Sequence, residues 1–399
     1  MSAPARTAAA GGTTAAEGTA AGGTTAQGAR PASRATGAGP FARLGGTRPV
    51  RVGAVSVLVR PRAVWVGAAA LAVLAAAVLG HLSLGGRPLA PDQVLAALAG
   101  DPAVPARVQL MVVEFRLPRT LAGIVAGACL AVAGAITQTV ARNPLATPEI
   151  LGVTSGASVG AVGILVLAGA GHGGASGVAE SVGMPVAAAA GALGVGCAVF
   201  LLAYRRAQQS LDSMRLVLVG LGAAGLATSL TTWLLTLGDV SNASQALTWM
   251  MGSLNGKDFS ATLPALAAAV PLMVLAAACG RWLVLSSFDD DTARGLGLPL
   301  GRSRPLLLLL AVLLAAVGTV LAGPVAFVAL VCPLAARSVA RAVVPPLGLT
   351  AVVGAAFTVA CDLLAGFALP QSLPVGVVTT VLGAPVLIAL VARSQRRSA

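Results

Sequence analysis

The chain has 399 residues, of which 57% are hydrophobic and only 10% are charged, and its mean hydropathy is +0.89. Soluble globular proteins carry about 25% charged residues, so this composition excludes a soluble enzyme and indicates a membrane protein. The net charge of +13 would suit a nucleic-acid partner, but 3% aromatic residues and no basic stripe on a soluble face do not favour that class.

Residues 1–60 are mainly Ala, Gly, Thr and Ser with scattered Arg, and they contain no apolar stretch. Such a segment cannot bury enough surface to offset the entropy cost of ordering it. We therefore expect a disordered cytoplasmic tail. The first apolar run begins too far along the chain to be the core of a secretory signal, so it predicts a retained span.

Ten apolar runs follow, each close to the 20 or so residues that cross a bilayer as a helix. They cover residues 64–84, 118–141, 150–170, 184–203, 215–237, 262–285, 305–322, 324–341, 343–366 and 373–392. The remaining residues are too few for a large extramembrane domain. The predicted fold is therefore an all-α membrane protein of ten helices, occupying residues 61–395.

The distribution of basic residues predicts the orientation of these spans. With the basic tail inside, 21 of the 26 basic residues fall on the cytoplasmic side. Only five fall outside: Arg87, Arg107, Arg116, Arg119 and Lys257. Cytoplasmic loops carry an excess of Lys and Arg, so we expect a multi-pass protein of the cytoplasmic membrane with both termini in the cytoplasm.

The residues with metal-binding chemistry are scattered. All five cysteines lie inside apolar runs and none forms a CxxC pair, which is typical of small buried hydrophobes. His81 and His172 lie at the edges of runs. We predict no metal site and no bound cofactor, and no nucleotide-binding loop is present, since the only lysine, Lys257, precedes Asp258 rather than Ser or Thr.

Two acidic features leave alternatives open. The run from Asp289 to Asp291 could be half of a metal-diphosphate site of a membrane prenyl-transfer enzyme, or the N-terminal cap of a short helix. Asp362 lies inside a predicted span, where a carboxylate is a functional candidate by default. A proton-coupled secondary transporter would use such a residue, although a structural role is the simpler reading.

A series of ordered motifs resembles the FecCD family, the permease subunits of bacterial ABC importers for iron-siderophore complexes, haem and vitamin B12. They begin with Arg116-Leu-Pro-Arg-Thr120, Arg142-Asn-Pro-Leu-Ala146, Pro148 and Leu151-Gly-Val-Thr-Ser-Gly156. They continue with Trp249-Met-Met-Gly-Ser253, Asp290 to Gly297, Gly323-Pro-Val-Ala-Phe327, Pro333 to Arg337, Asp362, Leu373-Pro-Val-Gly-Val377 and Gly383-Ala-Pro385. The resemblance covers about residues 60–395.

The resemblance implies a permease of the type II, vitamin B12 importer-like fold that works as a dimer with a second permease subunit in the membrane lipid. It implies ABC ATPase subunits on the cytoplasmic side, which would hold the ATP and Mg, and an extracytoplasmic substrate-binding protein. The chain itself would be a conduit and not an enzyme. A ferric siderophore is the expected substrate.

The resemblance also implies site residues. Arg116 and Arg119 match arginines that dock the binding protein. The loop at about residues 286–304 matches the segment that couples to the ATPase, through Asp290, Asp291, Ala293, Arg294, Leu296 and Gly297. Asn143, Leu145, Ser213 and Met214 match the cytoplasmic gate, and the fifth span would line the pathway with Gly220, Gly222, Gly225, Ser229 and Thr232.

Two positions depart from the family pattern. Leu334 stands where members often have His, and Gly366 stands where many have an Arg four residues after the Asp that corresponds to Asp362. The usual i, i+4 partner of Asp362 is therefore missing. We expect Asp362 to have lost its nearest partner, or to receive an arginine from an unlike second permease.

Overall fold

The structure is a computed structural model that describes residues 48–52, 55–59, 61–84, 87–169, 183–205, 210–211, 213–238, 240–367 and 373–395. Its contacts divide the chain into two units, Met1–Leu58 and Val59–Ala399. Near the boundary, β1 (Arg48–Val52) and β2 (Val55–Val59) pair as a two-stranded sheet. The expectation of no regular structure up to residue 60 is corrected for these residues, whose repeated Val favours strands.

The second unit is helical, as predicted. Each predicted span overlaps one of ten longer helices: α1 (Pro61–Ser83), α4 (Leu117–Val140), α5 (Val153–Gly169), α6 (Met184–Ala203), α7 (Ser213–Leu237), α9 (Phe259–Ala278), α12 (Leu300–Ala322), α13 (Val328–Ala340), α14 (Leu347–Phe367) and α15 (Val375–Gln395). The predicted span 262–285 is divided, because the helical conformation is interrupted at Cys279 and its last residues belong to α10. In the described part of the chain, seven apolar helical stretches are long enough to cross a membrane, while the apolar parts of α5, α13 and α15 are shorter. The all-α membrane fold is therefore confirmed.

Shorter elements connect these helices. They are α2 (Pro91–Leu98), α3 (Ala106–Leu110), the π-helical η1 (Met111–Arg116), the 3₁₀ helix η2 (Pro148–Leu151), α8 (Val240–Met250), α10 (Gly280–Ser286) and α11 (Asp290–Gly295), with the antiparallel pair β3 (Tyr204–Arg205) and β4 (Ser210–Leu211). Because α3 and η1 run directly into α4, the helical stretch of the predicted second span begins earlier in the chain, at Ala106.

The predicted span 324–341 begins later in the structure than expected. α13 starts at Val328 because Gly323 and Phe327 adopt the left-handed φ values +73° and +66°, which no helix can continue. The residues between them therefore form an irregular segment inside the helical unit. Non-helical backbone is tolerated at such a place when it is buried in protein or lines a water-filled cavity.

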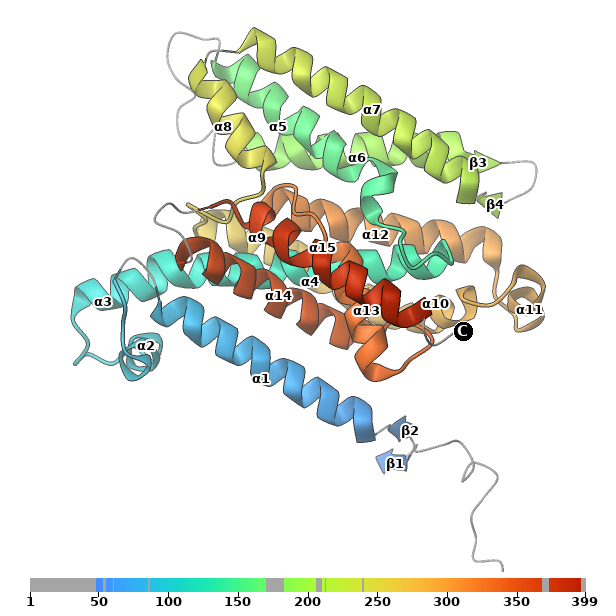
Figure 1. Ribbon diagram of the computed structural model, residues 1–399, viewed down its shortest axis with the longest axis horizontal. Coiled ribbons are helices and arrows are strands. Elements are labelled where there is room, and N and C mark those ends of the chain that lie inside the picture. Colours follow the sequence, from blue (N-terminus) through green and yellow to red (C-terminus); the bar gives the residue numbers. More distant parts are fainter. Residues whose placement is uncertain are drawn as a thin grey trace, which may run out of the picture. The chain divides into compact units, whose positions relative to one another are not determined.

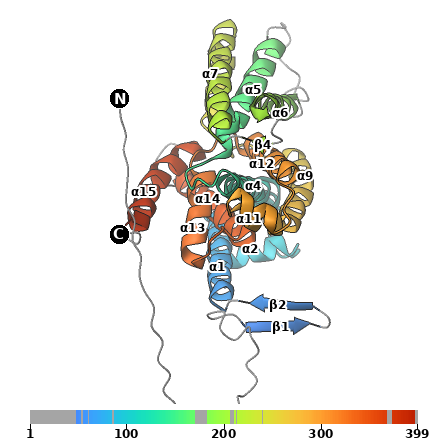
Figure 2. The ribbon, with the colours of Figure 1, turned by 90° about the vertical axis from the view of Figure 1, so that its right-hand side faces the viewer.

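α4 is the central helix of the second unit (Figure 1). It contacts α9, α12, α13 and α14, and nearly all of its residues are buried. α5 and α6 pack against each other and against α7, and α12 contacts both α4 and α6. A second view shows α4 again surrounded by its neighbours (Figure 2).

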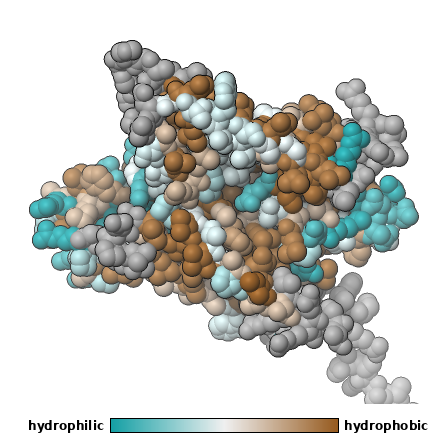
Figure 3. Space-filling model, turned by 45° about the horizontal axis from the view of Figure 1, so that its top comes forward, coloured by the Kyte–Doolittle hydropathy of each residue, from teal (hydrophilic) through white to brown (hydrophobic). Residues whose placement is uncertain are grey.

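Glycines allow these helices to approach at backbone distance. A Cβ atom on Gly127 would lie 2.4 Å from the carbonyl oxygen of Gly354, so α4 and α14 meet where both lack side chains. Close approach of this kind holds membrane helices together when lipid is as apolar as the side chains. On the face drawn in Figure 3, hydrophobic residues cover much of the middle and hydrophilic residues gather toward the two ends.

Candidate functional site: a glycine-floored recess and two charged hubs

A recess of about 460 Å³ opens where four separate segments of the chain meet. Its lining comes from η2 and the start of α5, the end of α8, the irregular segment before α13, and the start of α15. The lining residues are Glu149, Thr154, Met250, Met251, Pro324, Val325, Ala326, Gly376, Val377, Thr380 and Val381. Each segment carries one of the sequence motifs described above, so the motifs converge on one cavity.

Glycines fix three of these segments against one another. A Cβ atom on Gly376 would lie 2.1 Å from the carbonyl oxygen of Met251, and one on Gly252 would lie 2.5 Å from that of Pro324. Gly252 also has a φ of +74°, a conformation that L side chains rarely adopt. The Gly376 amide donates to the Gly252 carbonyl oxygen at 3.3 Å. The recess therefore has a floor of tightly packed backbone.

Glu149 is the only acidic residue among those that line the recess. Its side chain is exposed, and within the described structure its carboxylate has no hydrogen bond or ion pair. The sequence analysis did not select Glu149, although it stands inside the quoted motif region between Pro148 and Leu151.

A first charged hub joins α1, α4 and α14 at the ends predicted to face outward. The buried carboxylate of Asp362 accepts from Arg119 at 2.7 Å (Nε to Oδ2) and 2.8 Å (Nη2 to Oδ1). His81 Nε2 lies 2.7 Å from Oδ2 of the same carboxylate, and His81 Nδ1 lies 2.7 Å from the Thr120 hydroxyl. The expectation that Asp362 lacks a partner is therefore wrong, and no second subunit is needed to supply one.

Arg116 is also occupied within the chain. Its guanidinium donates to the carbonyl oxygens of Leu82, Ser83 and Arg87, which lie at or just after the end of α1. A cation at a helix C-terminus satisfies carbonyl groups that have no partner within the helix. Both arginines expected to dock a binding protein thus have partners within the chain, Arg116 at the end of α1 and Arg119 at Asp362 of α14, which their sequence positions do not reveal.

A second charged hub lies at the opposite ends of the helices. Asp290, at the start of α11, accepts from Arg304 of α12 at 2.6 Å and from Arg142 at the end of α4 at 2.7 Å. These two cations hold the pKa of Asp290 at about 2, with the hydrogen bond from Arg304 as the largest cause. Asp289 caps α11 by accepting from the Thr292 amide at 2.9 Å. The run of aspartates is thus a helix cap and an ion-pair centre, and its geometry does not support the metal-diphosphate alternative.

The remaining residues assigned to coupling divide into buried and exposed groups. Ala293 is fully buried against Leu298 and Leu300, so it belongs to the local core. Asp291, Arg294 and Leu296 are exposed, with Leu296 at 51%. Gly297 ends the segment at a φ of +83°, where a side chain would strain the backbone. The segment therefore presents a short exposed ridge on an anchored base.

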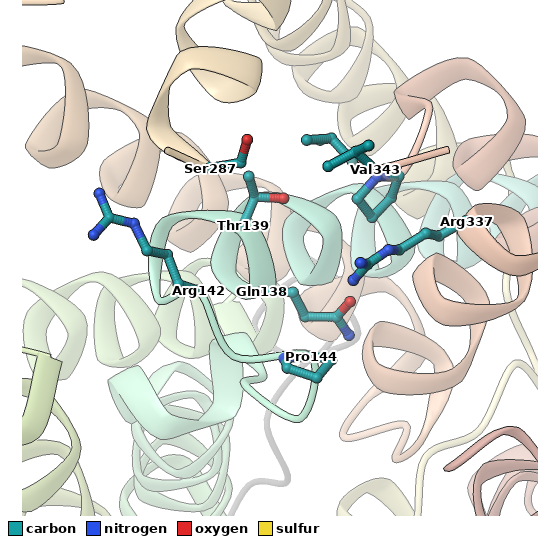
Figure 4. Close-up of a pocket in the computed structure, with 9 residues that line it drawn as sticks. Gln138, Thr139, Arg142, Pro144, Ser287, Arg337 and Val343 are labelled. Carbon is teal, nitrogen blue, oxygen red and sulfur yellow. The ribbon is translucent and has the colours of Figure 1, made fainter. Parts of the chain in front are cut away.

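Two of the four residues assigned to the cytoplasmic gate directly follow Arg142 of the second hub. Asn143 and Leu145 are exposed in the loop after α4, and the Asn143 side chain accepts from the Leu145 amide at 2.9 Å. A neighbouring pocket of about 180 Å³ contains Gln138 and Arg337, whose polar ends point toward each other, while Arg142 points away from them (Figure 4). Ser213 and Met214 begin α7, but their side chains lie outside the described residues.

α7 divides the five residues expected to line the pathway. A Cβ atom on Gly220 would lie 1.8 Å from the carbonyl oxygen of Ile150, so Gly220 is a packing residue against η2 and not a lining residue. Gly222 and Gly225 have open space around them, and Ser229 and Thr232 are exposed on the same helix. Four of the five therefore form an unpacked face of α7 within this chain.

Ten apolar helices, a recess lined at the breaks between them and charged hubs at both ends define a multi-pass transport permease. Comparison with known proteins gives the same class. The sequence matches the model of the FecCD transport family over residues 72–393. The chain belongs to this family.

Curated relatives cover most of the chain. The ferric enterobactin transport system permease protein FepG of Escherichia coli K12 is 37% identical over 77% of this chain and 90% of its own length. The probable siderophore transport system permease protein YfhA of Bacillus subtilis is 35% identical over 72% and 83%. The vitamin B12 import system permease protein BtuC of Salmonella typhi is 34% identical over 83% and 96%.

A solved structure supports the fold. The chain superposes with a TM-score of 0.71 and 25% identity on a metal-chelate type ABC transporter in an inward-facing conformation, covering 82% of this chain and 99% of that one. The protein is therefore a transport permease of the ABC importer kind, and as such a transport subunit and not a catalytic one. The prediction of family and fold is confirmed.

Proposed function

We propose that this protein is the transmembrane permease subunit of an ATP-driven importer that moves ferric-siderophore complexes across the cytoplasmic membrane by alternating access. The observation that carries this proposal is the recess at the meeting point of four family motifs, beside the irregular segment that precedes α13. Relatives named for siderophore transport support the substrate class, and the relatives named for vitamin B12 make cobalamin the second candidate.

The proposal includes partners that this chain lacks. ATPase subunits would contact the exposed ridge of Asp291, Arg294 and Leu296, and they would hold the ATP and Mg, leaving this chain without a cofactor. A substrate-binding protein would dock at the opposite ends of the helices, near Arg119. A second permease subunit would cover the open face of α7, with both termini of this chain in the cytoplasm. Asp362 has its partners in its own chain, so it gives no reason to prefer an unlike second subunit.

The test is uptake of iron-labelled complexes by cells in which the gene is deleted and then restored. We expect uptake of at least one ferric siderophore to fall to background on deletion and to return with the wild-type gene, because the importer would have no complete membrane pathway without this chain. If the deletion leaves uptake unchanged for a broad panel of hydroxamate and catecholate complexes but abolishes cobalamin uptake, the substrate is cobalamin and not a ferric siderophore.

A matched variant separates this function from a proton-coupled transporter that uses Asp362. If Asp362 relays protons, Asp362→Asn abolishes uptake driven by a proton gradient in vesicles without ATP. In our proposal the wild-type vesicles show no uptake without ATP and its hydrolysing partner. Gradient-driven uptake by the wild type would favour the secondary transporter.

A further inference from the structure

We propose that Glu149 makes the recess a charge filter that admits neutral and cationic metal chelates and disfavours polyanionic ones. The inference rests on the proposed function, because it concerns which chelates this permease passes. Glu149 lies between the motif residues Pro148 and Leu151, to which the sequence analysis gave no role in choosing the substrate, and the inference assigns it that role.

The first step is that Glu149 is free to interact with a ligand. The carboxylates of Asp290 and Asp362 accept hydrogen bonds from arginines at 2.6–2.8 Å. By contrast, the Glu149 carboxylate has no hydrogen bond or ion pair within the described structure and its side chain is exposed. An intramolecular structural role would need a partner for this group, since an unpaired charge away from bulk water is costly.

The second step is that nothing else in the recess balances this charge. Among the lining residues, the other polar side chains are the hydroxyls of Thr154 and Thr380, and the rest are apolar or glycine. The Thr380 hydroxyl donates to the Gly376 carbonyl oxygen at 2.7 Å, so it offers mainly its acceptor lone pairs to a ligand. Glu149 is thus the one charged group among the lining residues, and no lining cation offsets it, which suits a ligand that carries donors or positive charge.

The third step is that the recess can hold part of a chelate without sealing the carboxylate. Its volume of about 460 Å³ lies within the usual range of small-molecule sites, about 300–1,000 Å³. The Glu149 side chain is exposed in this recess, so a ligand that enters can reach its carboxylate, and charged side chains of membrane proteins characteristically face such cavities. A negative charge in a cleft with low-dielectric walls repels anions and attracts cations more strongly than one on an open surface.

The experiment compares uptake of three ferric complexes that differ in charge: a cationic trihydroxamate, a neutral trihydroxamate and a trianionic tris-catecholate. Cells that lack other routes express the whole importer with wild-type permease, Glu149→Gln or Glu149→Lys. We expect Glu149→Gln to raise the initial rate for the trianionic complex relative to the neutral one by about tenfold, with a larger rise for Glu149→Lys, since removing or reversing one charge removes like-charge repulsion. Asp92→Asn, an exposed acid on α2 outside the recess, is the matched control and should leave the ratio unchanged.

The binding protein could itself reject a complex, so the purified permease is tested alone in detergent. Trp249 directly precedes the lining residues Met250 and Met251, and a ferric complex in the recess should quench its fluorescence in a chain whose other tryptophans are Phe. We expect the Kd for the trianionic complex to fall about tenfold in Glu149→Gln, and that for the neutral complex to change less than about twofold. Equal changes for all charges, or no change in either assay, would overturn the inference. If the importer with wild-type permease takes up none of the ferric complexes, that result would instead overturn the proposed function.

Discussion

Arg119 and Asp362 are 243 positions apart in the chain, yet they form an ion pair with two hydrogen bonds at the predicted outer ends of the helices. The sequence predicts that Asp362 is unusual, because an acid in a span must find a partner. It cannot predict which partner, since Gly366 removes the local candidate and only the packing of α14 against α4 and α1 brings in Arg119 and His81. Sequence spacing predicts contacts between residues three or four apart on one helix. The partners of Asp362 lie on other helices, so spacing cannot predict them.

Asp290 allows a residue-scale prediction about acidity. Its pKa is about 2 in the folded protein, below the ordinary 3.8, because Arg304 and Arg142 favour the ionised form. A depressed pKa adds stability that is fully present above the ordinary value and is lost as the pH falls through the folded value. We therefore expect the α11 segment to loosen between about pH 4 and pH 2, which faster hydrogen exchange of the amides of residues 293–298 would report.

The matched variant is Asp290→Asn, which should show the faster exchange already at pH 7 and little further change on acidification. Asp291→Asn is the control, because Asp291 is 97% exposed and its ion pair in the described structure is with Arg294 on its own short helix. An Asp290→Asn protein that keeps wild-type exchange at pH 7 would contradict the role of Asp290 as the joint between α4, α11 and α12.

At the scale of elements, hydropathy predicts the helices because every span must satisfy its backbone internally. All ten predicted runs have a helix, while the breaks between them are harder to foresee. The late start of α13 depends on the left-handed conformations of Gly323 and Phe327, and the latter is not a residue type that signals such a turn. The recess forms at these breaks. The candidate site therefore lies where the hydrophobic pattern of the sequence does not predict the backbone conformation.

α7 provides the prediction at this scale. Gly220 packs against the Ile150 carbonyl, whereas Gly222, two positions later, has open space. Gly220→Ala should lower stability by about 1–3 kcal/mol, the usual cost of overpacking. Gly222→Ala should be neutral or slightly stabilising, since Ala is a better helix former by about 1 kcal/mol. Thermal unfolding of both variants in detergent checks this. Equal melting temperatures would contradict the conclusion that one face of α7 packs against η2 while the other is unpacked.

For the whole molecule, the predicted topology assigns charged residues to the outer or the inner ends of the spans. In the structure, residues assigned to the same side contact one another. His81, Arg119 and Asp362 are all predicted at outer ends, and they meet in one hub. Arg142, Asp290 and Arg304 are all predicted at inner ends, and they meet in the other. The alternation of the spans is therefore consistent with the contacts. Which end faces the cytoplasm rests on the excess of basic residues at the predicted inner side.

That orientation can be tested with single cysteines in a chain whose exposed Cys197 is changed to Ser, since the other four cysteines are buried. Asp92 and Arg302 are both exposed, and the topology places them outside and inside respectively. A membrane-impermeant maleimide should label Asp92→Cys in intact cells and should label Arg302→Cys only after the membrane is opened. The reverse pattern would invert the molecule, moving the Asp290 hub away from any cytoplasmic ATPase and placing the Arg119 hub beside it. Because positive charge is retained on the cytoplasmic side of a membrane, we expect the first pattern.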